Sequence, residues 1–298
     1  MKSIIVPTRN RPELLKRLID NVVPSLSAQD ELIIIDSSDD YFLSQRLSLN
    51  PEVKYITTGI RSAAVQRNMG LDEIADSRYV FFLDDDVEPD STYFEKCINI
   101  LESSNAIGVS GVAINPKSKD LRSYPSGLVG LYHRLFLLDS MRDGVLLKSG
   151  VNIPVRDYSG KVYDVDWLIG CSAWLTEKVG NTRFESDFLG QSLSEDVIFS
   201  VRMGKKGRIV TDPSIVLSHD ESDVARPSKL EFWQMWMINR YRLIQVAEFG
   251  LPGYFSYWWA NLGQFGILLY SKTRRRGYQP GSIKGLISGS LTVLGFEK

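Results

Sequence analysis

Residues 79–89 read YVFFLDDDVEP, an apolar run that ends in three consecutive carboxylates. The run Tyr79–Leu83 is rich in β-branched and aromatic residues, which is typical of a strand buried on both faces. Asp84, Asp85 and Asp86 follow, and three like charges at the mouth of a buried strand repel one another. A divalent cation, Mg²⁺ or Mn²⁺, held by one or two of these carboxylates and by substrate phosphates, would balance them. A solvated acidic turn is the alternative.

The composition is that of an ordinary globular protein. Of 298 residues, 43% are hydrophobic and 24% charged, which suits one large α/β domain with or without an appendage. The formal net charge of -1 argues against an electrostatically driven nucleic-acid binder. Two cysteines, Cys97 and Cys171, are too few for a disulfide framework and fit a reducing compartment. The first apolar run meets Pro7 too soon for a secretory signal, so we expect the cytosol or a cytosolic membrane face.

The start of the chain predicts a βαβ unit. Residues 3–6 indicate a strand that stops at Pro7, which cannot donate to a central ladder. Asn10 is the expected cap of a helix with an apolar stripe from Leu14 to Val22. A second strand, Glu31–Ile35, leads into Asp36. Ligands bind at the carboxyl ends of parallel strands. The residues expected at that edge are Thr8, Arg9, Asp36 and Asp84 to Asp86.

The middle of the chain continues the alternation of strands and helices. Strands are expected at 53–56 and 107–114, and helices at 61–75 and 91–101, whereas 115–160 shows no clear periodicity. Ser194, Glu195 and Asp196 head another helix, where the acids either cap the helix or take part in chemistry. Two short strands follow at 208–211 and 215–217, and the second delivers His219. A histidine at a strand end is usually structural, yet imidazole also binds Mn²⁺.

Taken together, these segments resemble an inverting family 2 glycosyltransferase with the nucleotide-sugar-binding α/β fold called GT-A. The matching pieces are SIIVPTRNR at the start, Asp36, Gly59 with AVQRNMG at 64–70, FLDDDV, Ser194 to Asp196, and His219. The main departure is Gln66, where the family pattern often has Ala. The resemblance implies a catalytic domain at 1–225 with a mostly parallel central sheet, followed by a C-terminal helical appendage at 226–298.

The resemblance also implies a donor site for a nucleoside-diphosphate sugar. Pro7, Thr8 and Arg9 would line the nucleotide pocket, and Asp36 would accept a hydrogen bond from an N–H of the base. Arg61 and Arg67 are candidates for pyrophosphate contact or for structural pairing.

Metal and catalytic roles follow from the same resemblance. Asp84 and Asp85 would reach the ribose and the metal shell, and Asp86 would bind Mn²⁺ or Mg²⁺ with His219 as a further ligand. The cation would stabilise the leaving diphosphate. Inversion needs a base on the far side of the sugar, and Asp196 is the candidate, with Glu195 orienting it or the acceptor. Trp167 is expected either to contact the acceptor or to belong to the core.

The C-terminal region is apolar and aromatic. Residues 230–249 suit a helix that packs one face on a neighbour, with Asn239, Arg240 and Arg242 placed off that face. Residues 254–270 carry no charge and precede the basic cluster of Lys272 and Arg274 to Arg276. That stretch is short for a membrane span, so we expect it to lie in the interface, where the basic cluster favours anionic headgroups. The predicted acceptor is a saccharide or a lipid-linked saccharide in cell-surface polysaccharide synthesis.

Two alternatives from other classes stay open. A phosphatase of the haloacid dehalogenase type also places acids after a buried strand, but Val87, Glu88 and Pro89 do not fit its pattern, and two βα units precede the acids here. A scaffold that keeps the fold without turnover is the second alternative. A sugar nucleotidyltransferase fits less well, because no Gly-rich, Arg-containing phosphate loop follows the first strand.

Overall fold

The computed structural model describes residues 1–40, 53–114, 124–157, 160–187, 193–219, 227–274 and 277–296. The chain folds into two compact units. Unit 1 comprises Met1–Leu121 and Asp157–Val224, and unit 2 comprises Arg122–Arg156 and Ala225–Lys298. A part of the segment that shows no periodicity in the sequence therefore belongs with the C-terminal helices.

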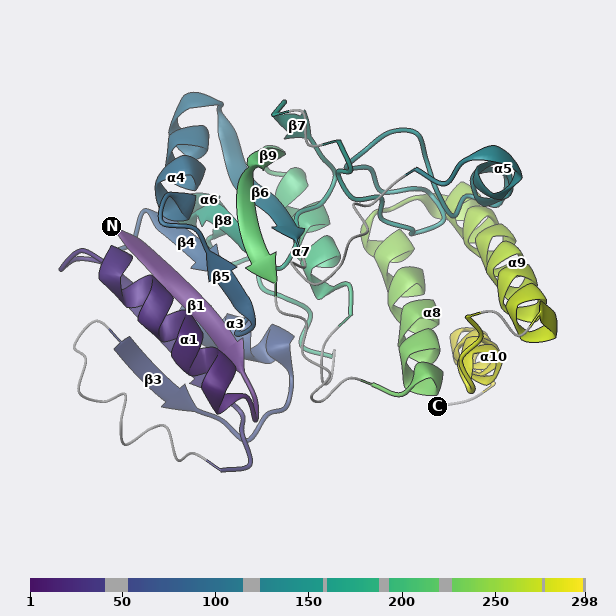
Figure 1. Cartoon of the computed structure of the whole chain (residues 1–298), viewed down its shortest axis with the longest axis horizontal. Coiled ribbons are helices and arrows are strands. Elements are labelled where there is room, and N and C mark those ends of the chain that lie inside the picture. Colours follow the sequence, from purple (N-terminus) through teal and green to yellow (C-terminus); the bar gives the residue numbers. More distant parts are fainter. Residues whose placement is uncertain are drawn as a thin grey trace. The chain divides into compact units, whose positions relative to one another are not determined.

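Unit 1 is built on one mixed sheet (Figure 1) with the strand order β3-β2-β1-β4-β8-β6-β9-β5, and β7 pairs with β9. The first four strands in that order are parallel to one another, whereas β8 runs antiparallel to both of its neighbours. The strands are β1 Lys2–Thr8, β2 Glu31–Asp36, β3 Val53–Thr57, β4 Tyr79–Phe82, β5 Val87–Pro89, β6 Ala106–Ile114, β7 Tyr163–Asp164, β8 Ser172–Leu175 and β9 Arg208–His219.

Helices cover both faces of this sheet because the strands bury alternate side chains on each side. Ile4 and Phe81 belong to the core cluster that contains the apolar stripe of α1 and residues of α4. Ile5 and Phe82 point to the other face, where a Cβ on Gly70 of α3 would lie 2.4 Å from Ile5, and Phe82 packs edge-on against the α7 ring of Phe199. The helices are α1 Pro12–Val22, α3 Ala63–Asp72, α4 Tyr93–Ser103, α6 Thr176–Val179 and α7 Glu195–Gly204, with a 3-10 turn η1 at Val23–Ser25.

Two predictions for the first βα unit are wrong. β1 continues through Pro7 to Thr8. The Ile5 carbonyl accepts a hydrogen bond from the Leu83 N–H, so the backbone polar groups of Ile5 and Pro7 face β4. β4 pairs with β1 only as far as Ile5. Pro7 therefore lacks its N–H at a position where no neighbouring strand needs it. Arg11, not Asn10, is the N-cap residue of α1, because Asn10 turns to the loop after β2.

The two strands expected at 208–211 and 215–217 are one strand. β9 runs unbroken from Arg208 to His219, and its register against β6 shifts between Ser110 and Val112. A Cβ on Gly111 would lie 2.1 Å from the Ile215 carbonyl oxygen, so glycine allows the close approach of the irregular segment. The continuous strand carries His219 to its last position.

Unit 2 is helical, with α5 Gly127–Leu135, α8 Lys229–Val246, α9 Gly250–Arg274 and α10 Ser282–Val293. Its core is formed by Met237, Ile244, Tyr257, Leu268 and Leu286, surrounded by partly buried aromatic rings. A Cβ on Gly285 would lie 2.2 Å from the Leu230 carbonyl oxygen, so α10 approaches the backbone of α8 closely. Ser228 and Glu231 form a capping box at the start of α8.

Two placements in α8 are corrected, because Asn239 and Arg240 are both buried. Arg240 was expected away from the apolar face, yet it is buried and donates to Asn261 Oδ1 at 2.9 Å and to the Ser149 carbonyl. Its guanidinium also lies 3.9 Å from the centre of the Trp236 ring. The second face of α8 is covered by α9 and the loop at Ser149, which a helical pattern within 230–249 alone does not show. Burial lowers the pKa of Arg240 to about 10.

Candidate functional site

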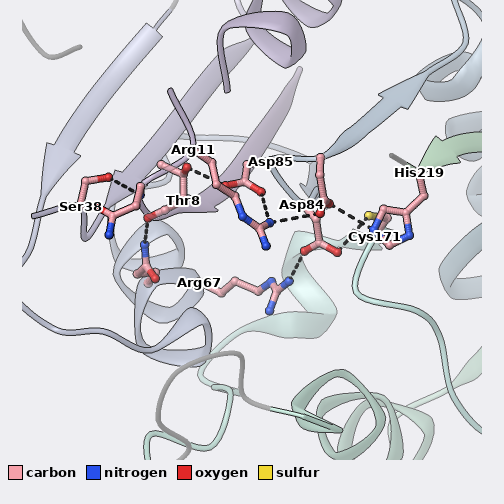
Figure 2. Close-up of polar contacts among 11 residues, drawn as sticks. Thr8, Arg11, Ser38, Arg67, Asp84, Asp85, Cys171 and His219 are labelled. Atoms are coloured by element: carbon pink, nitrogen blue, oxygen red, sulfur yellow. Dashed lines mark hydrogen bonds and ion pairs between the residues drawn. The ribbon is translucent and has the colours of Figure 1, made fainter. Parts of the chain in front are cut away.

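The carboxyl ends of β1, β2 and β4 bring most of the predicted donor residues to one edge of the sheet (Figure 2). Thr8 is the last residue of β1 and pairs in register with Asp36, the last residue of β2. The Thr8 hydroxyl donates to Asp85 Oδ2 at 2.7 Å. The first strand and the acidic triplet are therefore joined directly by a buried hydrogen bond.

Arg11 balances the charge of the triplet, a role that the sequence did not reveal. Its Nη1 lies 2.8 Å from Asp85 Oδ1 and 3.1 Å from Asp86 Oδ2. Burial raises the pKa of Asp85 to about 6, although Arg11 and the Thr8 hydroxyl oppose the rise. The second arginine of PTRNR was the available signal, because α1 begins directly beside the edge where the acids were expected.

Asp86 and His219, the two candidate metal ligands, are in contact. β5 pairs with β9 so that Val87 is opposite His219, and His219 Nε2 lies 3.2 Å from Asp86 Oδ1. Burial alone would raise the pKa of Asp86, but the hydrogen bond from His219 and the charges of His219 and Arg11 hold it below its ordinary value. Within the described ranges, no group of three or more His, Cys, Asp or Glu side chains is arranged to hold a metal ion.

Asp84 contacts different residues from those that contact Asp85 and Asp86. Arg67 of α3 donates from Nη2 to Asp84 Oδ1 at 2.6 Å (Figure 2), and its Nη1 forms an ion pair with Glu195 at the start of α7. The Cys171 thiol lies 3.7 Å from Asp84 Oδ2, and burial raises the pKa of that thiol well above its usual value. A Cβ on Gly170 would lie 3.3 Å from Arg67 Nη2, so the backbone before β8 closes over this pair.

Asp196 follows Glu195 in the first turn of α7. Its Oδ1 accepts from the backbone N–H of Val197 at 2.8 Å, and burial raises the pKa of Asp196 to about 6 despite the opposing charge of Arg67. Ser194, the residue before the pair, has φ of 70° and makes no side-chain cap. A non-glycine residue in the left-handed region is strained, and such strain is common at functional sites.

Asp36 is buried and already engaged. Its Oδ1 accepts from the Ser38 N–H at 2.7 Å, and its Oδ2 accepts from the Tyr55 hydroxyl of β3. A carboxylate offers about four lone-pair positions, so further donors can be accepted. Tyr55 was not recognised in the sequence, where it reads as an ordinary strand residue.

Arg9 and Arg61 converge on Asp39, in the loop after β2. Arg61 Nη2 lies 2.6 Å from Asp39 Oδ1, and Arg9 Nη2 lies 3.5 Å from Asp39 Oδ2. Asn10 exchanges two hydrogen bonds with Asp39, and the side-chain bond from Asn10 is the main reason that the pKa of Asp39 is lowered. Both arginines thus lie beside the carboxyl end of β2, and both side chains are more exposed than that of Arg67.

Two residues singled out in the sequence have structural partners. Gln66 is buried and donates to the carbonyl oxygens of Thr8 at 2.9 Å and Ile35 at 2.6 Å, so it ties β1 to β2. Trp167 is only 8% exposed, which leaves little of its ring available to an acceptor and agrees with the core alternative.

The described helices include none that is long and apolar enough to cross a membrane. The basic cluster is described in part, with Lys272 and Arg274 at the end of α9, whereas Arg275 and Arg276 lie outside the described residues.

Comparison with solved structures shows similar folds. PcManGT, a mannosyltransferase from Pyrobaculum calidifontis solved with GDP-Man and Mn²⁺, is 16% identical with a TM-score of 0.58, covering 100% of this chain and 88% of that one. GalNAc-T7 with UDP, GalNAc and Mn²⁺ is 14% identical with a TM-score of 0.59, covering 94% and 58%. TarS 1-349 from S. aureus with UDP is 15% identical with a TM-score of 0.53, covering 91% and 73%. The predicted GT-A-type α/β fold with C-terminal helices is confirmed.

Comparison at the sequence level gives the family. No curated protein sequence matches the chain. The family model described as "Glycosyl transferase family 2" matches residues 3–168, more than half of the 298 residues. This match confirms the resemblance seen in the sequence and does not favour the phosphatase or scaffold alternatives. The chain belongs to glycosyl transferase family 2.

Proposed function

We propose that this chain transfers a sugar, with inversion, from a nucleoside-diphosphate sugar to an acceptor hydroxyl. The observation that carries the proposal is the Arg67 bridge, which holds Asp84 of the acidic triplet and Glu195 of α7 on one guanidinium. The bridge brings the candidate base, next in sequence after Glu195, to the edge where the acidic strand ends. Donor binding and proton removal can then occur at one place.

The donor site in this proposal lies at the ends of β1 and β2. Pro7, Thr8 and Arg9 line the nucleotide pocket, and Asp36 accepts from the base while Ser38 and Tyr55 hold its carboxylate in place. Asp84 and Asp85 face the ribose and the shell of the cation. Arg61 is exposed in its ion pair with Asp39 and would exchange that partner for the diphosphate. Arg67 is 4% exposed between two carboxylates, so we assign it a positioning role.

Asp86 and His219 suit a divalent cation. The carboxylate of Asp86, directly before β5, and the imidazole of His219, at the end of the paired strand β9, form a donor set that Mn²⁺ accepts. Mn²⁺ or Mg²⁺ at such sites takes its remaining ligands from phosphate and water. When bound, the cation would stabilise the negative charge that develops on the leaving diphosphate. Arg11 lies beside the same carboxylates and adds fixed positive charge.

Asp196 is the proposed base. The acceptor oxygen attacks C1 of the sugar as its proton passes to the Asp196 carboxylate, and the bond from C1 to the diphosphate oxygen breaks with its electron pair. A pKa near 6 keeps Asp196 largely ionised at neutral pH and makes it a better proton acceptor than an ordinary carboxylate. Glu195, fixed by Arg67, orients the acceptor or the base, and Trp167 keeps the core role that its burial indicates.

The acceptor and the setting complete the proposal. We propose a saccharide or lipid-linked saccharide acceptor in cell-surface polysaccharide synthesis, used at the cytosolic face of the cell membrane. Residues 1–225 are assigned the catalytic role, and residues 226–298 the association with the membrane. The apolar and aromatic character of α9, followed by Lys272 and Arg274, supports this assignment.

Thermal shift with nucleoside diphosphates tests the donor site. UDP, GDP, CDP and dTDP are each added with and without Mn²⁺ to the full chain and to Asp86→Ala. A ligand that binds only the folded state raises the unfolding temperature. We expect one diphosphate to stabilise the wild type in a Mn²⁺-dependent manner, and Asp86→Ala to lose the Mn²⁺ dependence.

Two controls make this experiment decisive. Asp20→Ala removes an exposed carboxylate from α1 and should leave the Mn²⁺-dependent shift unchanged. Hydrolysis of the matching nucleotide sugar, or its transfer to an added saccharide, then separates an active enzyme from a scaffold. Stabilisation by none of the four diphosphates, or a shift that is identical in Asp86→Ala, would contradict the proposed donor site.

A further inference from the structure

Unit 2 carries an unusually apolar exposed surface on α9. Leu251, Phe255, Leu262 and Leu269 are all exposed, Phe255 by 75%. At 100° per residue they fall within about 40° of one another around the helix. Leu251 and Leu269 are 18 positions apart, or about 27 Å along the helix. The stripe is therefore continuous along one side of α9.

A second stripe lies on α5. Leu128, Leu131 and Leu135 are exposed, Leu128 by 85%, and their spacing of three and four residues places them on one face. This helix falls within the segment for which the sequence showed no periodicity. It was therefore not expected to contribute to a surface with the C-terminal helices.

The two helices that carry the stripes lie side by side within unit 2 (Figure 1). Trp259, 43% exposed between the leucines of α9, donates from Nε1 to the Leu135 carbonyl at 2.8 Å and stacks on Phe136 with 4.8 Å between the ring centres. The Tyr132 hydroxyl donates to the Gly263 carbonyl at 2.9 Å, and a Cβ on Gly263 would lie 2.4 Å from Phe136. These contacts fix α5 on α9, so the two stripes are held in a fixed arrangement relative to each other.

Charge identifies the partner of this surface. The 9-residue α5 and the 25-residue α9 contain no Asp or Glu, although 36 of the 298 residues of the chain are acidic. Arg134 lies in the last turn of α5, and Lys272 and Arg274 lie in the last turn of α9. The helical spacing places Lys272 about 80° to one side of the centre of the stripe and Arg274 about 120° to the other. A second copy of this face would bring cations to cations, whereas an anionic lipid surface brings the complementary charge.

We infer that the exposed stripes of α5 and α9 form one monotopic docking surface for an anionic membrane, with α9 lying in the plane of the interface. The apolar side chains enter the boundary between headgroups and acyl chains, Trp259 and Tyr270 lie at headgroup level, and the cations reach the lipid phosphates. The inference deepens the membrane association in the proposed function by naming its surface, and it adds α5 to that surface.

Sedimentation of the full chain with phosphatidylcholine vesicles, with and without phosphatidylglycerol, tests the inference. We expect binding to the phosphatidylglycerol vesicles, and a loss of about tenfold or more when Phe255 and Leu262 are both changed to Glu. Leu128→Glu with Leu131→Glu should have a comparable effect. Replacing Lys272 and Arg274 by Gln should weaken binding about fivefold for each cation, the equivalent of about 1 kcal/mol.

The matched control is Ile287→Glu, which places the same charge on an exposed apolar position of α10, outside the stripes. It should bind vesicles as the wild type does. No binding by the wild type, or an equal loss in Ile287→Glu, would overturn the inference. So would a dimer that forms without vesicles and dissociates in the Phe255→Glu, Leu262→Glu variant, because the face would then join two copies.

The diphosphate thermal shift is measured on the same variants. A retained shift with lost vesicle binding shows that folding and the donor site are intact and supports the inference. If the wild type binds vesicles but no diphosphate, the proposed donor site fails and the docking surface stands. If the wild type binds a diphosphate but no vesicles, the docking surface fails and the proposed donor site stands.

Discussion

Arg67 and Asp84 are joined at 2.6 Å between a helix and the end of a strand, and the same guanidinium also holds Glu195. The side chains of Arg67 and Glu195 are almost completely buried, whereas that of Asp84 is 37% exposed. Removal of the arginine therefore leaves Glu195 as the uncompensated buried charge, while water can still solvate Asp84.

We predict that Arg67→Met lowers the free energy of unfolding by about 3 kcal/mol, measured by urea denaturation, because one partner of a buried pair is removed. Adding Glu195→Gln should recover part of that loss. The comparison variant Arg61→Met removes an exposed arginine from Asp39 and should cost less than about 1 kcal/mol. Equal losses in the two single variants would contradict the buried bridge.

Asp196→Asn should reduce kcat about a thousandfold, because the amide cannot accept the acceptor proton, while the diphosphate thermal shift stays that of the wild type. Thermal shift and initial rates on one preparation measure both effects. A variant that loses diphosphate binding together with turnover would assign Asp196 to the donor site instead.

The pH dependence of kcat tests the same residue independently. Asp196 must be ionised to accept a proton, and burial raises its pKa to about 6. Protonation of Asp196 therefore lowers kcat, which should be constant above that pH and fall about tenfold per pH unit below it. The residual activity of Asp196→Asn should lack this acidic limb, whereas an unchanged limb would assign it to Asp85, whose pKa burial also raises to about 6. If kcat of the wild type instead falls only below about pH 4, the pKa of the Asp196 carboxyl is not raised in the working enzyme.

Gln66→Leu should destabilise the protein by about 1 to 2 kcal/mol, because the Thr8 and Ile35 carbonyls each lose a buried donor. Diphosphate binding should also weaken, since the end of β1 carries Thr8. Gln29→Leu, an exposed position in the same unit, should change stability by less than about 0.5 kcal/mol. Equal effects would show that the two hydrogen bonds do not matter.

Ser194→Gly should raise the free energy of unfolding by up to about 1 kcal/mol, because glycine adopts a φ of 70° without strain and no side-chain cap is lost. Ser194→Val should lower it, since a β-branched residue tolerates that conformation poorly. Ser126 is the comparison position, because it is the N-cap residue of α5 and has an ordinary φ of -110°. Ser126→Gly should not stabilise the protein, and a gain there would contradict the backbone argument.

The sequence predicted the strands and their acidic ends because both follow from local rules. The apolar run before Asp84 needs burial on two faces, and parallel strands place their carboxyl ends at one edge. From these rules the proximity of Thr8, Asp36 and the triplet could be expected. The family pattern added α7 and His219, which no local rule connects to that edge.

Other features depend on contacts between segments that are distant in sequence. Pro7 remains in β1 because the pairing of β4 with β1 ends at Ile5. β9 stays one strand through its irregular segment because Gly111 of β6 leaves room for the Ile215 carbonyl. Arg240 is buried by α9 and the loop at Ser149, which the pattern of α8 does not contain. Such tertiary contacts override local periodicity, so sequence spacing alone does not reveal them.

The division of the chain into two units has a practical consequence for protein engineering. The chain passes between the units three times, after Leu121, after Arg156 and after Val224. A truncation near residue 225 would therefore leave α5 attached to unit 1 without the α9 residues that Tyr132 and Phe136 contact. The C-terminal helices are not a removable tail, and a functional chimera with a relative would have to exchange both the inserted segment and the C-terminal one.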